Sequence, residues 1–320
     1  MKVAVTGATG FIGRAIAREA AGRGFEVVAP YRSSPPSGED LLRPSGIRWV
    51  AWDAWERGDE RFDVVVHSAA LRHRHGVAAE EYERVNIDLT DRVVERARRA
   101  KVNRFVYVSS IATYGWPSNL PIDESFPPNP VGRYGASKVE TERRVRASGL
   151  PLTIVQPSIT YGPGDTNGMI DKMMRMIAKS AFVIPGLGRT RVQLAYIDDV
   201  GRLTVDAALS ARTLGDRFIC TYKDPIRVGD LVRKIARIVG GRVAPFGPPT
   251  ALLRLAGGGL EALDRFGLFR GKEPPLTREK LATISVDRAY RIDHLRDLLG
   301  TEPRVGYDEG LALTARAMGL

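Results

Sequence analysis

A glycine-rich turn near the start of the chain constrains the fold more than any other feature. Gly7, Gly10 and Gly13 lie between an apolar run and a segment with helical spacing. In such a strand–turn–helix unit the first glycine permits a tight turn, the second lets the backbone approach a pyrophosphate, and the third lets helix and strand pack closely. The helix N-terminus offers free N–H groups and a positive dipole end to phosphates. The turn therefore predicts a dinucleotide site contacted by Gly7, Thr9, Gly10, Phe11, Ile12 and Gly13.

Short apolar runs alternate with helical segments through the first half of the chain. The predicted strands are residues 3–6, 26–29, 48–51, 63–67, 104–109 and 152–156. The predicted helices between them are residues 11–23, 79–100 and 134–147. This order favours parallel pairing with helices on both faces, which is a Rossmann-like, doubly wound α/β sheet.

The regular alternation is lost in the second half, which predicts a smaller, discontinuous lobe. We assign residues 1–162 and 190–222 to the dinucleotide-binding domain. Residues 163–189 and 223–320 form the predicted substrate lobe, with helices expected at 229–239 and 250–266. This lobe should close over the carboxyl ends of the strands.

The residues after the second strand bear on the choice of nicotinamide cofactor. An NAD site usually has Asp or Glu there, whereas this chain has Arg32 followed by Ser33. Because a guanidinium suits a bidentate phosphate contact, NADP(H) is favoured and NAD(H) is the alternative. The alternative is that Arg32 is a solvated loop arginine beside a site that accepts either cofactor.

Two further pairs are candidate cofactor contacts. Asp53, next to Ala54, follows the third strand and could accept a hydrogen bond from the adenine amino group. Ala69 and Ala70 follow the fourth strand and are small enough to let the cofactor pass close by. Either pair could instead be ordinary loop residues.

A candidate catalytic group combines Tyr134, Lys138 and Ser110. The tyrosine and lysine are four residues apart and share a helix face, so the ammonium is expected beside the phenol. That proximity would lower a phenol pKa that is ordinarily about 10. The phenol could then move a proton while hydride is transferred. Ser110 follows Ser109 at the carboxyl end of the fifth strand, where a hydroxyl can orient a reacting oxygen.

Taken together, these motifs resemble an extended short-chain dehydrogenase/reductase of the epimerase/dehydratase and 3β-hydroxysteroid dehydrogenase superfamily. The matching segments are residues 6–13, 63–70, 85–86, 106–115, 134–138, 156–164 and 196–200. The resemblance implies that Ser110 assists Tyr134 and that Lys138 also binds the nicotinamide ribose. It implies further cofactor contacts at Ser109, Pro157, Ser158 and Ile159, and candidate substrate contacts at Ala112, Thr113 and Tyr161. Asn86 matches a family asparagine whose role here is functional or structural.

Departures from the family pattern narrow the expected activity. Dehydratases carry an Asp-Glu pair where this chain has Ile111 and Ala112, which cannot transfer protons. Sugar epimerases place an arginine where this chain has Val192, with Arg191 one step away. Residues 249–269 are rich in Leu, Ala and Gly, as in members acting on lipophilic alcohols. These residues would line an apolar pocket, pack in the lobe, or contact a membrane peripherally.

Composition limits which other classes of protein the chain can belong to. The formal charge is +11, but basic and acidic residues are interleaved and no nucleic-acid motif appears, so an acidic cofactor is the better use of the charge. A single cysteine, Cys220, fits a reducing compartment. With no secretory leader and no apolar run long enough to span a bilayer, we expect a cytoplasmic protein. The four histidines are too sparse for a metal site.

The leading hypothesis is an oxidoreductase that interconverts a secondary alcohol and a ketone on a lipophilic, steroid-like ring. A nucleotide-sugar 4-epimerase or ketoreductase is the enzymatic alternative. A non-catalytic NADP-sensing protein is the alternative from another class, although such relatives tend to lose the tyrosine or lysine. The substrate, the reaction direction and a family-type homodimer stay open.

Overall fold

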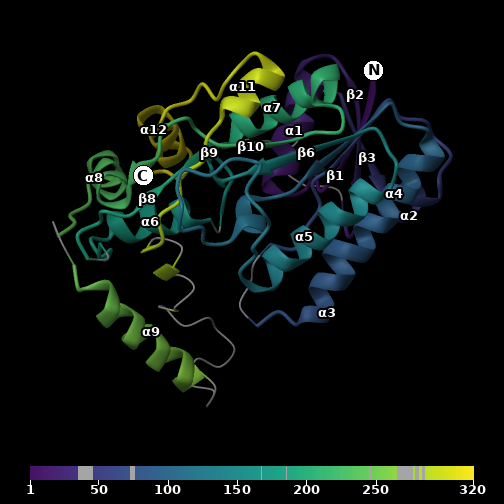
Figure 1. Ribbon diagram of the computed structural model, residues 1–320. Coiled ribbons are helices and arrows are strands. Elements are labelled where there is room, and N and C mark those ends of the chain that lie inside the picture. Colours follow the sequence, from purple (N-terminus) through teal and green to yellow (C-terminus); the bar gives the residue numbers. More distant parts are fainter. Residues whose placement is uncertain are drawn as a thin grey trace.

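The computed structural model describes residues 1–34, 46–72, 76–166, 168–184, 186–244, 247–264, 277, 281–282 and 285–320. Its centre is a seven-stranded parallel sheet in the order β10-β6-β5-β4-β1-β2-β3 (Figure 1). The strands are β1 (Lys2–Thr6), β2 (Glu26–Tyr31), β3 (Ile47–Ala51), β4 (Val64–His67), β5 (Arg104–Val108), β6 (Leu152–Pro157) and β10 (Arg217–Cys220). The strand order reverses between β1 and β4, which is where ligands bind in open α/β sheets. The predicted doubly wound fold is confirmed.

Helices cover both faces of this sheet, and the pleat of β1 explains why. Val3 and Val5 join one apolar cluster, while Ala4 between them joins another on the opposite face. The first cluster receives α1 (Phe11–Gly22), α7 (Ile197–Leu209) and α11 (Asp293–Leu299). The second receives α2 (Trp52–Arg57), α4 (Leu89–Ala100) and α5 (Gly132–Ala147). Such double coverage accounts for the continuous apolar runs of the strands.

The helix predicted at 79–100 is interrupted in the structure. It consists of α3 (Ala79–Tyr82), a π-helical turn η1 (Glu83–Asp88) and α4. The π turn contains Asn86, whose side chain accepts a hydrogen bond from Leu71 N at 2.7 Å and donates to Leu71 O at 3.1 Å. Single π turns inside helices often mark functional positions.

A separate apolar cluster builds the lobe from segments far apart in the sequence. It joins α6 (Met169–Ala178), α8 (Val228–Val239) and α12 (Tyr307–Ala317). Two short sheets lie beside it: β7 (Ile159–Tyr161) pairs with β9 (Leu194–Tyr196), and β8 (Arg191–Val192) pairs with β11 (Ile226–Arg227). Helix α9 (Thr250–Asp264) projects away from the body (Figure 1). Residues 265–266 of the predicted helix fall outside the described part of the chain.

One arginine of α4 is used inside the protein. Arg96 is almost completely buried, donates to Trp55 O at 2.8 Å and Glu60 O at 2.6 Å, and stacks on the Trp55 and Phe62 rings. At the surface, Arg92 forms an ion pair with Glu56. Both arginines therefore hold the α2 segment against α4.

Within the described residues, no helix is long and apolar enough to cross a membrane.

The exposed edge of the sheet at β10 is capped by a carboxylate. Glu124 Oε1 accepts a hydrogen bond from the buried Ile219 N–H at 2.7 Å, and the Glu124 carbonyl accepts one from Arg217. An edge strand with unpaired N–H groups is a site for unwanted pairing, so this contact ends the sheet.

Glu124→Ala should lower the free energy of unfolding by about 1–3 kcal/mol, because it leaves the Ile219 N–H buried without an acceptor. Glu124→Gln retains an acceptor oxygen and should recover most of the loss. Urea unfolding of the three proteins measures this. An alanine variant as stable as the wild type would remove the capping role.

Candidate active site

The glycine turn is built by close backbone contacts at the carboxyl end of β1. Gly7 has φ +76°, and a Cβ there would lie 2.6 Å from Ala69 N after β4. A Cβ on Gly13 would lie 2.2 Å from Gly7 O. Neither contact can be relieved by a side-chain movement because both partners are backbone. The turn and the first turn of α1 are thereby pressed against the end of β4.

The same turn leaves space and hydrogen-bond donors for a phosphate. A Cβ on Gly10 would meet only Gly7 O, at 3.2 Å, and Thr9 and Gly10 are exposed. Helix α1 begins without a side-chain cap and has no acidic residue in its first turn. Its N–H groups and positive dipole end are therefore available to an anion. This geometry fits a nicotinamide dinucleotide, whose pyrophosphate Gly10, Phe11 and Ile12 would hold.

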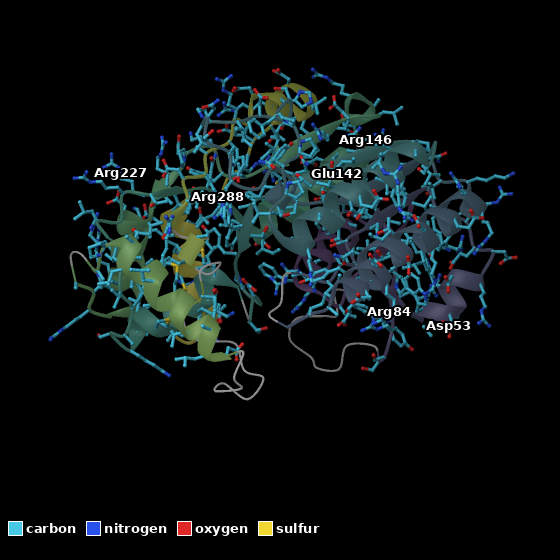
Figure 2. All side chains as sticks on the ribbon, turned by 60° about the horizontal axis from the view of Figure 1, so that its bottom comes forward. Asp53, Arg84, Glu142, Arg146, Arg227 and Arg288 are labelled. Carbon is cyan, nitrogen blue, oxygen red and sulfur yellow. The ribbon has the colours of Figure 1, made fainter. Side chains whose placement is uncertain are left out.

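Other predicted cofactor residues lie at the carboxyl edge of the sheet. Arg32 and Ser33 directly follow β2 and are exposed. Asp53 and Ala54 are exposed in the first turn of α2, after β3, and Figure 2 shows Asp53 at the surface. The structure thus brings these positions to the side of the sheet where the glycine turn lies. Their contacts with a cofactor stay predictions.

Pro157, Ser158 and Ile159 follow one another where β6 ends. Ser158 is buried and its hydroxyl donates to Thr221 Oγ1 at 2.8 Å. Ser158 N–H also donates to Cys220 O at 3.0 Å, which fixes this segment against β10. The backbone expected beside the carboxamide is therefore held rigidly.

Ser110 and Tyr134 form the centre of the predicted catalytic group. Ser110 follows β5, and its Oγ accepts a hydrogen bond from Ala112 N at 3.1 Å. Tyr134 lies in the first turn of α5, with its phenol close enough to the Ser110 side chain for the two to interact. Burial raises the pKa of Tyr134 above 10, while the Ser110 side chain and the Arg72 charge oppose that rise. The phenol is therefore protonated at neutral pH.

Lys138 lies one helical turn beyond Tyr134 and is completely enclosed. Its Nζ lies 3.1 Å from Tyr107 Oη and donates to Val108 O at 2.9 Å, so β5 holds the amine. Burial lowers the pKa of Lys138 to about 7, and the Glu142 carboxylate acts in the opposite direction. The sequence-based expectation that Lys138 depresses the Tyr134 pKa is not met, because burial raises that pKa and the opposing influences come from Ser110 and Arg72.

Asn86 connects the π turn to the helix that carries Tyr134. Its Nδ2 donates to Ser137 Oγ at 2.8 Å, and Ser137 Oγ donates to Tyr134 O at 2.8 Å. Behind it, Thr90 donates to Asn86 O at 2.6 Å and is hydrogen-bonded to His67 Nε2 at 2.8 Å. Burial lowers the pKa of His67 to about 3, so this chain of contacts is neutral at His67. Its role is to fix the position of α5 against β4.

Sequence reasoning missed a buried carboxylate beside the catalytic group. Glu142 accepts hydrogen bonds from Ser109 Oγ and from Gln156 Nε2, the latter at 2.9 Å, and lies 3.6 Å from Arg217. It stands four residues after Lys138, a spacing that places both on one helix face. This four-residue spacing could have identified Glu142 from the sequence.

The three candidate substrate residues are placed differently. Thr113 and Tyr161 are each 1% exposed. Thr113 donates to Ser110 O at 3.0 Å, and a Cβ on Gly310 would lie 2.4 Å from the Tyr161 hydroxyl. Both side chains therefore face the interior. Ala112 alone is half-buried at the site.

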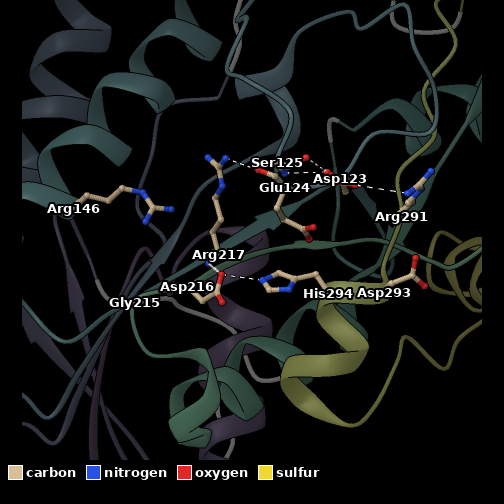
Figure 3. A pocket seen from close by; sticks show the side chains of 10 residues that line it. All are labelled: Asp123, Glu124, Ser125, Arg146, Gly215, Asp216, Arg217, Arg291, Asp293 and His294. Carbon is tan, nitrogen blue, oxygen red and sulfur yellow. Dashed lines mark hydrogen bonds and ion pairs between the residues drawn. The ribbon is translucent and has the colours of Figure 1, made fainter.

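A cavity of about 740 Å³ lies elsewhere, at the β10 edge. Figure 3 shows charged side chains around it, with the His294 imidazole directed at Asp216, 2.9 Å away. Its other walls come from the 123–125 segment, Arg146 and Arg291. No predicted catalytic residue lines it, and geometry rather than cavity size identifies the site. Among the described residues, no group of His, Cys, Asp and Glu could hold a metal ion.

Comparison with known proteins identifies the family of this chain. The family model described as NAD dependent epimerase/dehydratase family matches residues 3–218. The chain is 27% identical over 335 residues to the 2-alkyl-3-oxoalkanoate reductase of Stenotrophomonas maltophilia, covering 97% of each protein. It is 26% identical to 3beta-hydroxysteroid-dehydrogenase/decarboxylase isoform 1 of Arabidopsis thaliana, covering 90% of this chain and 70% of that protein.

Among solved structures, the fold resembles that of the UDP-glucuronic acid 4-epimerase from Bacillus cereus in complex with NAD. The TM-score is 0.78 at 20% sequence identity, with 100% of this chain and 99% of that chain covered. At this identity the likeness concerns the fold.

The burial of Lys138 predicts a pH-dependent stability. Its folded pKa of about 7 lies below the 10.5 of a lysine in the unfolded chain, so between these values the unfolded chain binds more protons and wild-type stability should rise with pH. The slope from this group is at most about 1.4 kcal/mol per pH unit. The difference in free energy of unfolding between wild type and Lys138→Met should therefore increase across this range.

Lys172→Met, which replaces an exposed lysine, is the matched control and should differ from the wild type by a pH-independent amount. Parallel curves for wild type and Lys138→Met would contradict the lowered pKa.

Proposed function

Because this chain belongs to the NAD dependent epimerase/dehydratase family, we propose that it is an oxidoreductase interconverting a secondary alcohol and a ketone on a ring substrate. The observation that carries the proposal is the placement of Ser110 at the end of β5 beside Tyr134 in the first turn of α5, with Lys138 one turn further along and held by Val108 O at 2.9 Å. A nicotinamide dinucleotide would supply or accept the hydride when bound.

The protonation states support distinct roles for the three side chains. Tyr134, neutral at pH 7, is a proton donor to the oxygen of a ketone and the proton acceptor in the reverse direction. Ser110 can donate to the same oxygen and so orients it. Lys138, with a pKa of about 7, would hold the ribose hydroxyls and lend positive charge near the phenol.

A lipophilic substrate of the steroid-like kind is the class we favour. Ile111 and Ala112 follow Ser110, so the site lacks the acid/base pair that elimination of water needs. Two relatives are named as acting on a 2-alkyl-3-oxoalkanoate and on a 3beta-hydroxysteroid, which agrees with this class.

A nucleotide-sugar 4-epimerase or ketoreductase is the second candidate, because a UDP-sugar epimerase shares the fold. Arg191 is the residue nearest to a diphosphate-binding position. Its guanidinium is paired with Asp287 at 3.0 Å, and its N–H donates to the same carboxylate at 2.7 Å. This pairing weighs against a diphosphate contact. A non-catalytic sensor is disfavoured because Ser110, Tyr134 and Lys138 are all present.

NADP(H) is the cofactor we propose, with NAD(H) as the alternative. Arg32 and Ser33 stand exposed after β2, where a 2′-phosphate would be bound, and no carboxylate replaces them at that position.

Tyr134→Phe should reduce turnover by about 10²–10⁴-fold, because it removes the proton donor while leaving the ring in place. NADPH binding should be retained. The assay is NADPH oxidation with the best substrate from a steroid and ketone screen. Tyr82→Phe removes a neighbouring phenol that donates to Arg72 O at 3.4 Å, and it should keep wild-type turnover. Wild-type turnover in Tyr134→Phe would remove Tyr134 from the mechanism.

Arg32→Ala should weaken NADPH binding about 10–100-fold while changing NADH binding little, since a charge-assisted phosphate contact is lost. Isothermal titration with both cofactors measures the ratio. Arg57→Ala, at the exposed end of α2, is the matched control and should leave both affinities unchanged. Equal losses for the two cofactors in Arg32→Ala would show that Arg32 does not bind the 2′-phosphate.

A further inference from the structure

Helix α9 directs its apolar face to solvent, whereas an ordinary surface helix buries that face. Leu252, Leu255, Gly259 and Leu263 are spaced three and four residues apart and therefore share one face. The three leucines on it are 57%, 72% and 47% exposed, so the apolar face points to solvent.

The polar face of α9 is directed the other way. Arg254, Gly257, Glu261 and Asp264 share the opposite side by the same spacing, and Gly257 is the residue of this helix that is buried. Glu261 and Asp264 are half-buried, although carboxylates normally occupy the wet side of a helix. The orientation of α9 therefore leaves an apolar surface without a protein partner in the described chain.

A neighbouring loop extends this surface. Gly186 N donates to Pro248 O at 2.9 Å and Gly247 N donates to Gly186 O at 3.0 Å, which fastens the loop to the base of α9. The loop carries Val183 and Leu187, which are 51% and 61% exposed. We call Val183, Leu187, Leu252, Leu255 and Leu263 the apolar strip. Contiguous apolar exposure of this kind marks an interaction site.

The charge of the surrounding lobe indicates what covers the strip. Nine exposed cations of the lobe have no ion pair with a carboxylate among the described residues: Lys172, Lys179, Arg189, Arg227, Arg237, Arg242, Arg254, Arg304 and Arg316. Asp171 and Asp230 are each paired with an arginine of their own helix, at 3.0 and 2.7 Å. Exposed carboxylates of the lobe without an ion pair among the described residues are fewer than the cations: Asp224, Asp297 and Glu309. Figure 2 shows Arg227 at the outer side of the lobe.

We propose that the apolar strip is a docking surface for an anionic phospholipid bilayer, with α9 lying in the interface and the surrounding cations on lipid head groups. An apolar helical face combined with unpaired cations is the arrangement that binds such a surface. A symmetric contact between two copies is less favourable, because it would bring the same unpaired cations together. The inference goes beyond the proposed function and does not depend on it.

The test is flotation of the full chain with lipid vesicles, which needs neither cofactor nor substrate. Wild-type protein should bind vesicles of equal parts phosphatidylcholine and phosphatidylglycerol, bind phosphatidylcholine vesicles far less, and lose binding as salt rises. Leu252→Ser/Leu255→Ser should weaken binding at least about tenfold, since two apolar side chains no longer leave water. Lys179→Glu/Arg189→Glu should weaken it on anionic vesicles.

The matched control is Leu209→Ser/Leu214→Ser, which replaces two leucines of the sheet domain that are 46% and 54% exposed. It should bind vesicles as the wild type does. Absence of wild-type binding, or equal binding by both leucine pairs, would overturn the proposal. A dimer in light scattering that Leu252→Ser/Leu255→Ser abolishes would show instead that a second copy covers the strip.

Discussion

The contact between the β1 turn and the end of β4 is the constraint on which the site depends. Gly7 can approach the Ala69 backbone because it has no Cβ and adopts a positive φ. Gly13 can approach Gly7 because it also has no Cβ. These contacts set the start of α1 at the point where the strand order reverses. Arg32, Asp53, Ala69, Ser110 and Ser158 follow the carboxyl ends of β2, β3, β4, β5 and β6, so they lie at the same edge of the sheet as the turn.

Desolvation shifts the pKa values of the two predicted catalytic side chains in opposite directions. Burial raises the pKa of Tyr134 and lowers that of Lys138, so the phenol keeps its proton while the amine is close to releasing one. The Glu142 carboxylate opposes the lowering of the Lys138 pKa. The same carboxylate accepts a hydrogen bond from Ser109, directly after β5. A single buried carboxylate thus links the electrostatics of α5 to the position of β5.

The sequence predicted the sheet well, because its strands are buried runs punctuated by glycine and its helices repeat with a regular period. The resemblance to extended short-chain dehydrogenases/reductases, drawn from the glycine turn and the Ser110, Tyr134 and Lys138 pattern, is confirmed by the family match. The π turn at Asn86 was missed because the residues on both sides of it are helical and a single inserted residue has no distinct sequence signal. The burial of Arg96 could not be predicted, since sequence cannot show that aromatic rings enclose it. The outward apolar face of α9 was equally hidden, because amphipathic spacing gives a face but not its direction.

The central claim is that this site binds a nicotinamide dinucleotide for alcohol–ketone chemistry and does not hold a nucleotide sugar. Calorimetric titration of the cofactor-free protein with NADPH, NADH and UDP-glucose tests it most directly. The account predicts tight binding of NADPH, weaker binding of NADH and no heat from UDP-glucose. Tight binding of UDP-glucose together with a preference for NAD would contradict it and make the protein a sugar epimerase.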